Sequence, residues 1–303
     1  AITGEAVKTY FEQQNDLFLL NAYSNQTIWK DIKVRYQWTN QESREGNVML
    51  SYGANFDMAG MLLEVFTQDN EVNADGFKEF LGQRFSQFVR LDNEIRIHHY
   101  LSKDQSMNYR LQLGAGIPLA NNGLNLPFDY SFFGGGSNDN RGFRARSLGP
   151  GVYKYYLDTN RTVTEIGDIR LGASAEYRFQ ITDILEGALF SDVGNIWTYN
   201  EDENRPGGKF TSDFYKQMSV SGGFGLRIDF TFLILRLDLG IPLRNPALPE
   251  NARWIFQDKT PYFQEAIDKW GTNPSTGEYI YEERDLLPNP FQPQFHIGIG
   301  YPF

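Results

Sequence analysis

Apolar and polar side chains alternate with a period of two along several long stretches of this sequence. Successive side chains of an extended chain point to opposite sides, so this alternation predicts β-strands with one apolar and one polar face. In residues 219–230 one face holds Val220, Gly222, Phe224, Leu226, Ile228 and Phe230, and the other holds Ser221, Gly223, Gly225, Arg227 and Asp229. Residues 89–98, 169–180 and 233–244 repeat the pattern. We therefore expect an all-β chain.

Charges of both signs share the polar face of these strands. Arg236 and Asp238 lie on one face of their strand, and Arg170 and Glu176 lie on one face of theirs. The core between two packed sheets could not accept such a face. A wet barrel interior accepts it, and the clean aliphatic face fits lipid, where an Arg or Lys near the midplane costs about 2–4 kcal/mol. The pattern therefore predicts a transmembrane antiparallel β-barrel.

Composition agrees with this membrane class. No apolar run approaches the roughly 18 residues of a transmembrane helix, and the mean hydropathy of −0.47 reflects the polar half of each strand. Aromatic residues make up 15% of the chain, as interfacial girdles require. Cysteine is absent, which excludes disulfides and cysteine metal sites. The net charge of −10 argues against a nucleic-acid partner.

The last ten residues have the same alternation and end on an aromatic residue. One face carries Phe295, Ile297, Ile299, Tyr301 and Phe303, and the other carries Gln294, His296, Gly298 and Gly300. We expect a final strand with its apolar face in lipid and its last ring at the membrane interface. Gly298, Gly300 and Pro302 should weaken that strand. Alternation on this segment alone is also typical of an edge strand in a sandwich.

Nine strands are predicted, and their connections alternate between short and long. The strands lie near 28–39, 47–65, 84–100, 106–118, 167–180, 185–198, 219–230, 233–244 and 294–303. The short connections lie near 40–46, 101–105, 181–184 and 231–232, and the long ones near 66–83, 119–166, 199–218 and 245–293. Outer-membrane barrels have short periplasmic turns and long external loops. We therefore expect a periplasmic C-terminus, and an external stretch 1–26 with a short helix over 4–14.

An odd number of strands does not suit a closed bacterial barrel, which usually has an even number and no free edge. We therefore expect residues 1–303 to be the C-terminal portion of a larger outer-membrane barrel domain.

The long connection 119–166 contains a distinctive glycine-rich motif. It reads Phe132, Phe133, Gly134, Gly135, Gly136, Ser137, Asn138, Asp139, Asn140, Arg141, Gly142, Phe143, Arg144, Ala145, Arg146, Ser147, Leu148, Gly149, Pro150 and Gly151. With five strands after it, this motif closely resembles the sixth external loop of the BamA/TamA superfamily of outer-membrane assembly proteins (the bacterial surface antigen family), most of all its TamA-like members. Phe190, Asp192, Gly194 and Trp197 also fit that family's next strand. The resemblance covers roughly 84–303 well.

The resemblance implies that the loop folds into the barrel as a latch. In the family the loop arginine is held by two acidic residues, a role that carries over to Arg141, Glu176 and Asp192. The residues themselves suit it, because a guanidinium grips carboxylates bidentately. Gly142 allows close approach to a wall, and Phe143 supplies an apolar plug. The alternative is that Arg141 is a solvated loop residue.

The family further implies the C-terminal half of a 16-stranded barrel in the bacterial outer membrane. Its function would be protein insertion, assembly or translocation through a lateral gate at the last strand, where an unpaired edge templates a client strand. The implied partners are outer-membrane lipid, the remaining barrel strands, client outer-membrane proteins and other assembly or periplasmic subunits. We expect no periplasmic POTRA domain within residues 1–303. The alternative function is a passive pore or receptor barrel.

Enzyme motifs are lacking in the sequence. The three histidines are His98, His99 and His296, with no HExxH or paired spacing. No G-x-S-x-G elbow surrounds a serine of the long loop. We therefore predict no enzyme activity, no cofactor and no metal site.

Overall fold

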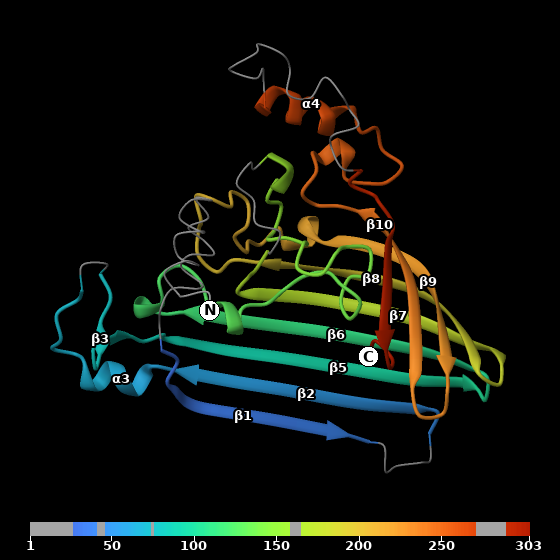
Figure 1. The fold of residues 1–303 in the computed structure, drawn as a ribbon, viewed down its shortest axis with the longest axis horizontal. Helices are drawn as coiled ribbons and strands as arrows, with labels where there is room; N and C mark the ends of the chain where they lie inside the picture. The colour runs from blue at the N-terminus through green and yellow to red at the C-terminus, as the bar shows by residue number, and fades with distance from the viewer. Residues whose placement is uncertain (1–26, 41–45, 74–75, 158–164, 271–288) are drawn as a thin grey trace, which may run out of the picture.

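A computed structural model describes residues 27–40, 46–73, 76–157, 165–270 and 289–303. Its strands are β1 (Lys30–Thr39), β2 (Val48–Ala59), β3 (Glu79–Phe80), β4 (Gln83–Arg84), β5 (Phe88–Ser102), β6 (Gln105–Pro118), β7 (Ile169–Thr182), β8 (Leu185–Trp197), β9 (Ser219–Asp229), β10 (Ile234–Arg244) and β11 (Gln294–Ile299). Nine of them form one antiparallel sheet in the order β1-β2-β5-β6-β7-β8-β9-β10-β11 (Figure 1). The short β3 and β4 pair as a separate hairpin.

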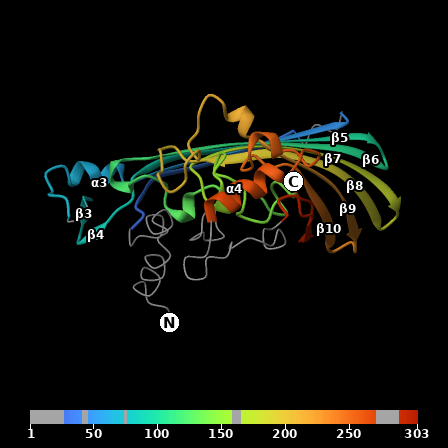
Figure 2. The same cartoon turned by 90° about the horizontal axis from the view of Figure 1, so that it is seen from above.

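The polar side of the sheet is the buried side. Along β6, buried and more accessible residues alternate almost without interruption. Arg110 is 5% exposed, whereas its neighbour Leu111 is 38% exposed. The sheet curves, and the green loop between β6 and β7 lies on its concave side (Figure 2). This arrangement inverts that of a soluble domain and confirms the predicted class, a transmembrane antiparallel β-barrel wall.

The described strands form an open sheet. β1 and β11 stand at the two ends of the strand order, and each has a single neighbour. β1 pairs with β2 along most of its length, whereas β11 pairs with β10 only from Gln294 to Ile299. The nine predicted strands are thus all present, and in the described residues they leave two edges.

The short and long connections lie at opposite ends of the sheet, as predicted. The short connections 103–104, 183–184 and 230–233 join neighbouring hairpin strands. The long loops lie at the other end (Figure 1). In the chain, α3 (Met61–Phe66) follows β2, and α4 (Thr260–Trp270) is part of the loop that connects β10 to β11. The predicted helix over 4–14 lies outside the described residues.

Besides the last strand, two predicted strands differ from the structure at their ends. The strand predicted over 47–65 stops at Ala59, because Gly60 adopts a left-handed φ of 74° and begins α3. Asp31 accepts hydrogen bonds from the backbone N–H groups of Met61 and Leu62, which satisfies two free donors of that helix. The strand predicted over 84–100 is split into β4 and β5, with an irregular stretch between them.

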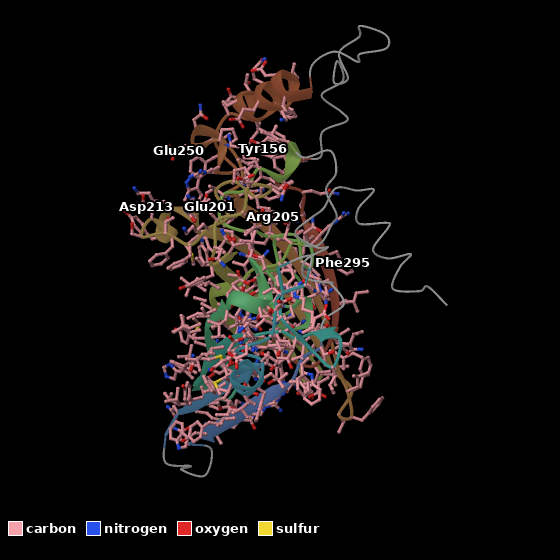
Figure 3. All side chains as sticks on the ribbon, turned by 90° about the vertical axis from the view of Figure 1, so that its left-hand side faces the viewer. Tyr156, Glu201, Arg205, Asp213, Glu250 and Phe295 are labelled. Atoms are coloured by element: carbon pink, nitrogen blue, oxygen red, sulfur yellow. The ribbon has the colours of Figure 1, made fainter. Side chains whose placement is uncertain are left out.

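Two of the long loops pack against each other through a small apolar cluster. It contains Tyr156, Leu248, Ala252, Tyr262, Ala266 and Phe291. Glu265 of α4 accepts hydrogen bonds of 2.5 Å from both Lys154 and Tyr156. The loop after β6 and the loop after β10 are therefore joined away from the sheet, at the position labelled Tyr156 in Figure 3.

Among the described residues, no helix is long and apolar enough to span a membrane.

The inverted sheet generates a prediction for charge placement. Leu111→Arg puts a guanidinium on the convex apolar face and should lower the free energy of unfolding by about 2–4 kcal/mol. Gly53→Arg is the matched control at similar depth on the opposite face. Gly53 lies opposite Glu94, which lies opposite Gln112, and a Cβ at Gly53 meets no atom within 4 Å.

The measurement is equilibrium unfolding in urea of both variants folded in lipid vesicles. Equal losses in the two variants would contradict this assignment of faces.

Candidate functional site

The loop between β6 and β7 lies on the concave side of the sheet and is held by hydrogen bonds just before β7 begins. Phe132 and Gly167 form an isolated antiparallel bridge. The carboxylate of Asp168 accepts hydrogen bonds from the backbone N–H of Leu126 (2.8 Å) and of Tyr199 (2.9 Å). Burial raises the pKa of Asp168 to about 7, although these two hydrogen bonds oppose the shift. Nothing in the strand pattern predicts this role of Asp168, whose side chain is buried and not solvated.

The glycine-rich motif lets this loop reverse direction. Gly135 and Gly136 have φ angles of 86° and 105°, which other residues rarely adopt. A Cβ on Gly135 would lie 2.3 Å from the carbonyl oxygen of Arg144. Asp139 accepts a hydrogen bond of 2.7 Å from the Gly135 N–H and holds the reversal closed. The turn carries residues 137–142 to the strands on the concave face.

Arg141 lies at the tip of the loop and is 1% exposed. Its Nε and Nη2 donate to the two carboxylate oxygens of Asp192 at 2.9 and 3.0 Å, and its backbone N–H donates to Oδ2 at 3.1 Å. Nη1 lies 2.5 Å from Glu176. The ring of Phe190 lies 3.5 Å from the guanidinium carbon, in cation–π contact. The structure therefore brings Arg141, Glu176 and Asp192 together.

These residues belong to a larger buried group, here called the charge cluster. Its members are Arg141, Arg178, Arg227, Arg236, Glu176, Asp192 and Asp238. Every side chain in it is at most 4% exposed. Asp238 pairs with Arg227 at 2.5 Å and Arg236 at 3.0 Å, and lies 3.9 Å from Arg141. The cluster joins β7, β8, β9 and β10 to the loop.

The partners of Arg141 are not equivalent. Glu176 is also paired with Arg178 at 2.6 Å and Arg227 at 3.1 Å. Among the described residues, the only ion pair of Asp192 is the one with Arg141. Burial by itself lowers the pKa of Arg141, but Asp192 and Glu176 outweigh burial, so the net pKa is raised. Arg141 therefore stays charged, and Asp192 depends on it.

Gly142 and Phe143 seat the tip against the wall. A Cβ on Gly142 would lie 2.5 Å from the Ser221 side chain and 2.9 Å from the nitrogen of Pro242. A Cβ on Gly240 would lie only 2.0 Å from the carbonyl oxygen of Arg141. Phe143 is buried. The loop main chain thus lies directly on β9 and β10, at a distance that requires glycine on both sides.

The last strand is shorter than predicted. Phe295, Ile297 and Ile299 are 63%, 66% and 77% exposed and share one face, as expected. The strand ends at Ile299, and Gly300 adopts a φ of 79°. Tyr301 and Phe303 therefore leave the apolar row, which corrects the prediction of one continuous face from 295 to 303.

Arginines on the concave face account for this inward turn. The ring of Phe303 lies 4.8 Å from the guanidinium carbon of Arg110, and the ring of Tyr301 lies 4.2 Å from that of Arg178. The Tyr301 hydroxyl donates to Glu186 at 3.1 Å. Cation–π contacts of this kind stabilise an aromatic ring that has left the lipid face.

One further contact joins the last strand to the loop. His296, on the concave face of β11, has its Nε2 2.8 Å from the carbonyl oxygen of Arg141. The position of His296 on the polar face was predicted, but its contact was not, because nothing in the strand pattern points to the loop tip. No cluster of three or more potential metal ligands occurs among the described residues.

The asymmetry between the partners of Arg141 yields a stability prediction. Arg141→Ala leaves Asp192 buried without its ion pair and should cost about 3–5 kcal/mol. Asp192→Asn keeps a hydrogen-bond acceptor and leaves Arg141 with Glu176, so it should cost less. The measurement is urea unfolding in lipid vesicles. A larger loss for Asp192→Asn would contradict the pairing described.

Comparisons with known proteins agree with this architecture. The family model of the Omp85 superfamily domain matches residues 65–303. A curated relative, the outer membrane protein assembly factor BamA of Neisseria meningitidis, is 27% identical over 121 residues. That match covers 36% of this chain but 15% of the relative.

A solved structure, BamA from Haemophilus ducreyi lacking POTRA domains 1–3, is 14% identical, with a TM-score of 0.40. The match covers 70% of this chain and 51% of that one. Likeness to TamA-like members in particular stays a prediction. Because the family model matches well over half of the sequence, the chain belongs to the Omp85 superfamily.

Proposed function

We propose that this chain is part of a factor that inserts, assembles or translocates proteins at the bacterial outer membrane. Membership of the Omp85 superfamily and the similarity to a BamA protein support the general class. The observation that carries the proposal is the buried Arg141, held by Asp192 and Glu176 at the tip of an inward-folded loop. The loop acts as a latch that fixes one side of the barrel.

The proposed mechanism uses strand pairing and breaks no covalent bond. β11 has six residues and is an edge strand among the described residues. An exposed edge presents unpaired N–H and C=O groups, which are a template for a client strand. The charge cluster holds β7 to β10 together on the concave side. β11 can therefore unpair from the first strand of the complete barrel while β7 to β10 keep their positions.

Partners and orientation follow from the same proposal. The exposed apolar face contacts outer-membrane lipid, and the edges of the sheet adjoin the remaining barrel strands. Clients are other outer-membrane proteins, and further assembly or periplasmic subunits cooperate with them. The short turns and the C-terminus lie in the periplasm, whereas the long loops face outward. No cofactor or enzymatic step is part of the proposal.

A passive pore or receptor barrel is the competing function. The inward loop argues against an open pore, because it places a buried, ion-paired tip on the concave side. A pore also has no need of a tip seated against Gly240 at such close range. The two functions differ in what they require of Arg141, and this difference provides the test.

The test compares Arg141→Ala with Arg144→Ala in cells that depend on the protein. Arg144 lies three positions away in the same loop and is exposed, so its variant controls for loss of a loop cation. Arg141→Ala should lower the amount of folded client barrels in the outer membrane at least several-fold, and Arg144→Ala should not. The measurement is the folded fraction of clients on semi-native gels. Full client assembly with Arg141→Ala would favour the passive barrel.

Orientation is tested separately by cysteine labelling. Because the sequence has no cysteine, each introduced cysteine is the single labelling site in this chain. The positions are Glu201, Glu250, Lys103 and Asp183, each exposed, and Glu201 and Glu250 lie in the long loops labelled in Figure 3. Single cysteines at Glu201 and Glu250 should react with a membrane-impermeant maleimide on intact cells. Cysteines at Lys103 and Asp183 should react only after permeabilisation. Labelling of the short turns from outside would reverse the orientation.

A further inference from the structure

The last strand has little to hold it through the sheet itself. β11 pairs along one edge, over the six positions from Gln294 to Ile299. Its apolar residues are largely exposed, so burial of apolar surface within the described chain stabilises it little. Yet its concave face lies directly above the loop tip. A contact on that face would therefore have a large share in keeping β11 in place.

His296 makes such a contact. Its Nε2 lies 2.8 Å from the carbonyl oxygen of Arg141. A carbonyl oxygen only accepts hydrogen bonds, so Nε2 carries the proton and donates it. The same oxygen lies against the backbone of Gly240 on β10. The loop tip is thus seated on β10 and hydrogen-bonded to β11.

The other concave-face positions of β11 offer no equivalent contact. The side-chain amide of Gln294 donates to the carbonyl oxygen of Gln292, two residues earlier in the chain. Gly298 has no side chain, and Arg236 of β10 lies where its Cβ would be. In register, His296 lies opposite Asp238 of the charge cluster. Among the described residues of β11, His296 is therefore the side chain that reaches the loop tip.

We propose that His296 is a positioning residue that ties the last strand to the inward-folded loop. When β11 is in its place in the sheet, Nε2–H holds the Arg141 carbonyl. When β11 separates from β10, that hydrogen bond breaks, whereas the ion pairs of Arg141 with Asp192 and Glu176 stay intact. The coupling therefore runs from the latch to the edge strand through the main chain of Arg141.

This inference deepens the proposed function, since it names what links the latch to the gate strand, but its test does not use assembly activity. Local opening of β11 is measured by amide hydrogen exchange of residues 295–299 in the folded full chain in lipid nanodiscs. The variants are His296→Ala, His296→Gln and Gln294→Ala. Glutamine replaces the ring donor with an amide N–H of similar reach. Gln294→Ala removes a side chain from the same face of the same strand.

His296→Ala should speed exchange in 295–299 by roughly 3- to 10-fold, the equivalent of one net hydrogen bond. His296→Gln should restore most of the protection, and Gln294→Ala should leave it unchanged. Amides of β7 and β8 should exchange at the original rate in all three variants, which shows that the latch and the barrel are intact.

Two outcomes would overturn the inference. Unchanged exchange of 295–299 in His296→Ala would show that the hydrogen bond does not hold the strand. Equal acceleration in β7, β8 and β11 would show a general structural role instead of a tether. Failure of client assembly to depend on Arg141 would count against the proposed function alone and would leave this exchange result standing.

Discussion

Buried charge on the concave side of the sheet is the constraint on which the rest of this structure depends. A charge removed from water is costly unless a partner of opposite sign and further hydrogen bonds accompany it. Asp192 on β8 meets this requirement only when the loop brings Arg141 to it, with three hydrogen bonds from one residue. The wall and the loop therefore require each other. A strand pattern with charges on a buried face is stable here because the loop completes it.

The charge cluster also explains why the loop tip needs glycine. The guanidinium of Arg141 reaches both acids only if its own main chain lies almost on the strands. Gly142 and Gly240 make that approach possible, because a Cβ at either position would collide with backbone atoms on the other side. The arginine makes the charge-assisted hydrogen bonds, and the glycines allow the loop backbone to come close enough to the strands for those bonds to form.

The strands of the wall could be predicted from the sequence. The contacts on its concave side could be predicted only in part. A period of two fixes which residues face each way, so strands such as 219–229 and 234–244 agree with their predicted ranges to within a residue. The pairing of Arg141 with two acids came from a family resemblance, because no local pattern records a contact across 51 residues. Both α3 and the inward turn at Gly300 were missed. Asp31 binds the start of α3, and Arg110 and Arg178 contact the rings that turn inward after Gly300. Each of these three residues lies on a strand distant in sequence from the feature it stabilises.

The distribution of interactions around β11 gives the gate proposal its physical basis. On one side, four strands and the loop share ion pairs that are almost fully buried, so separating them would expose several charges to incomplete pairing. On the other side, β11 has one backbone ladder and one hydrogen bond from His296. The residues that follow it add cation–π contacts of Tyr301 and Phe303 and single hydrogen bonds to Glu186, Arg110 and Arg178. Each of these is individually weak and is remade by water or by another strand at little cost. Local opening of a protein begins where such contacts are fewest. If the wall opens within this chain, the break should therefore fall between β10 and β11.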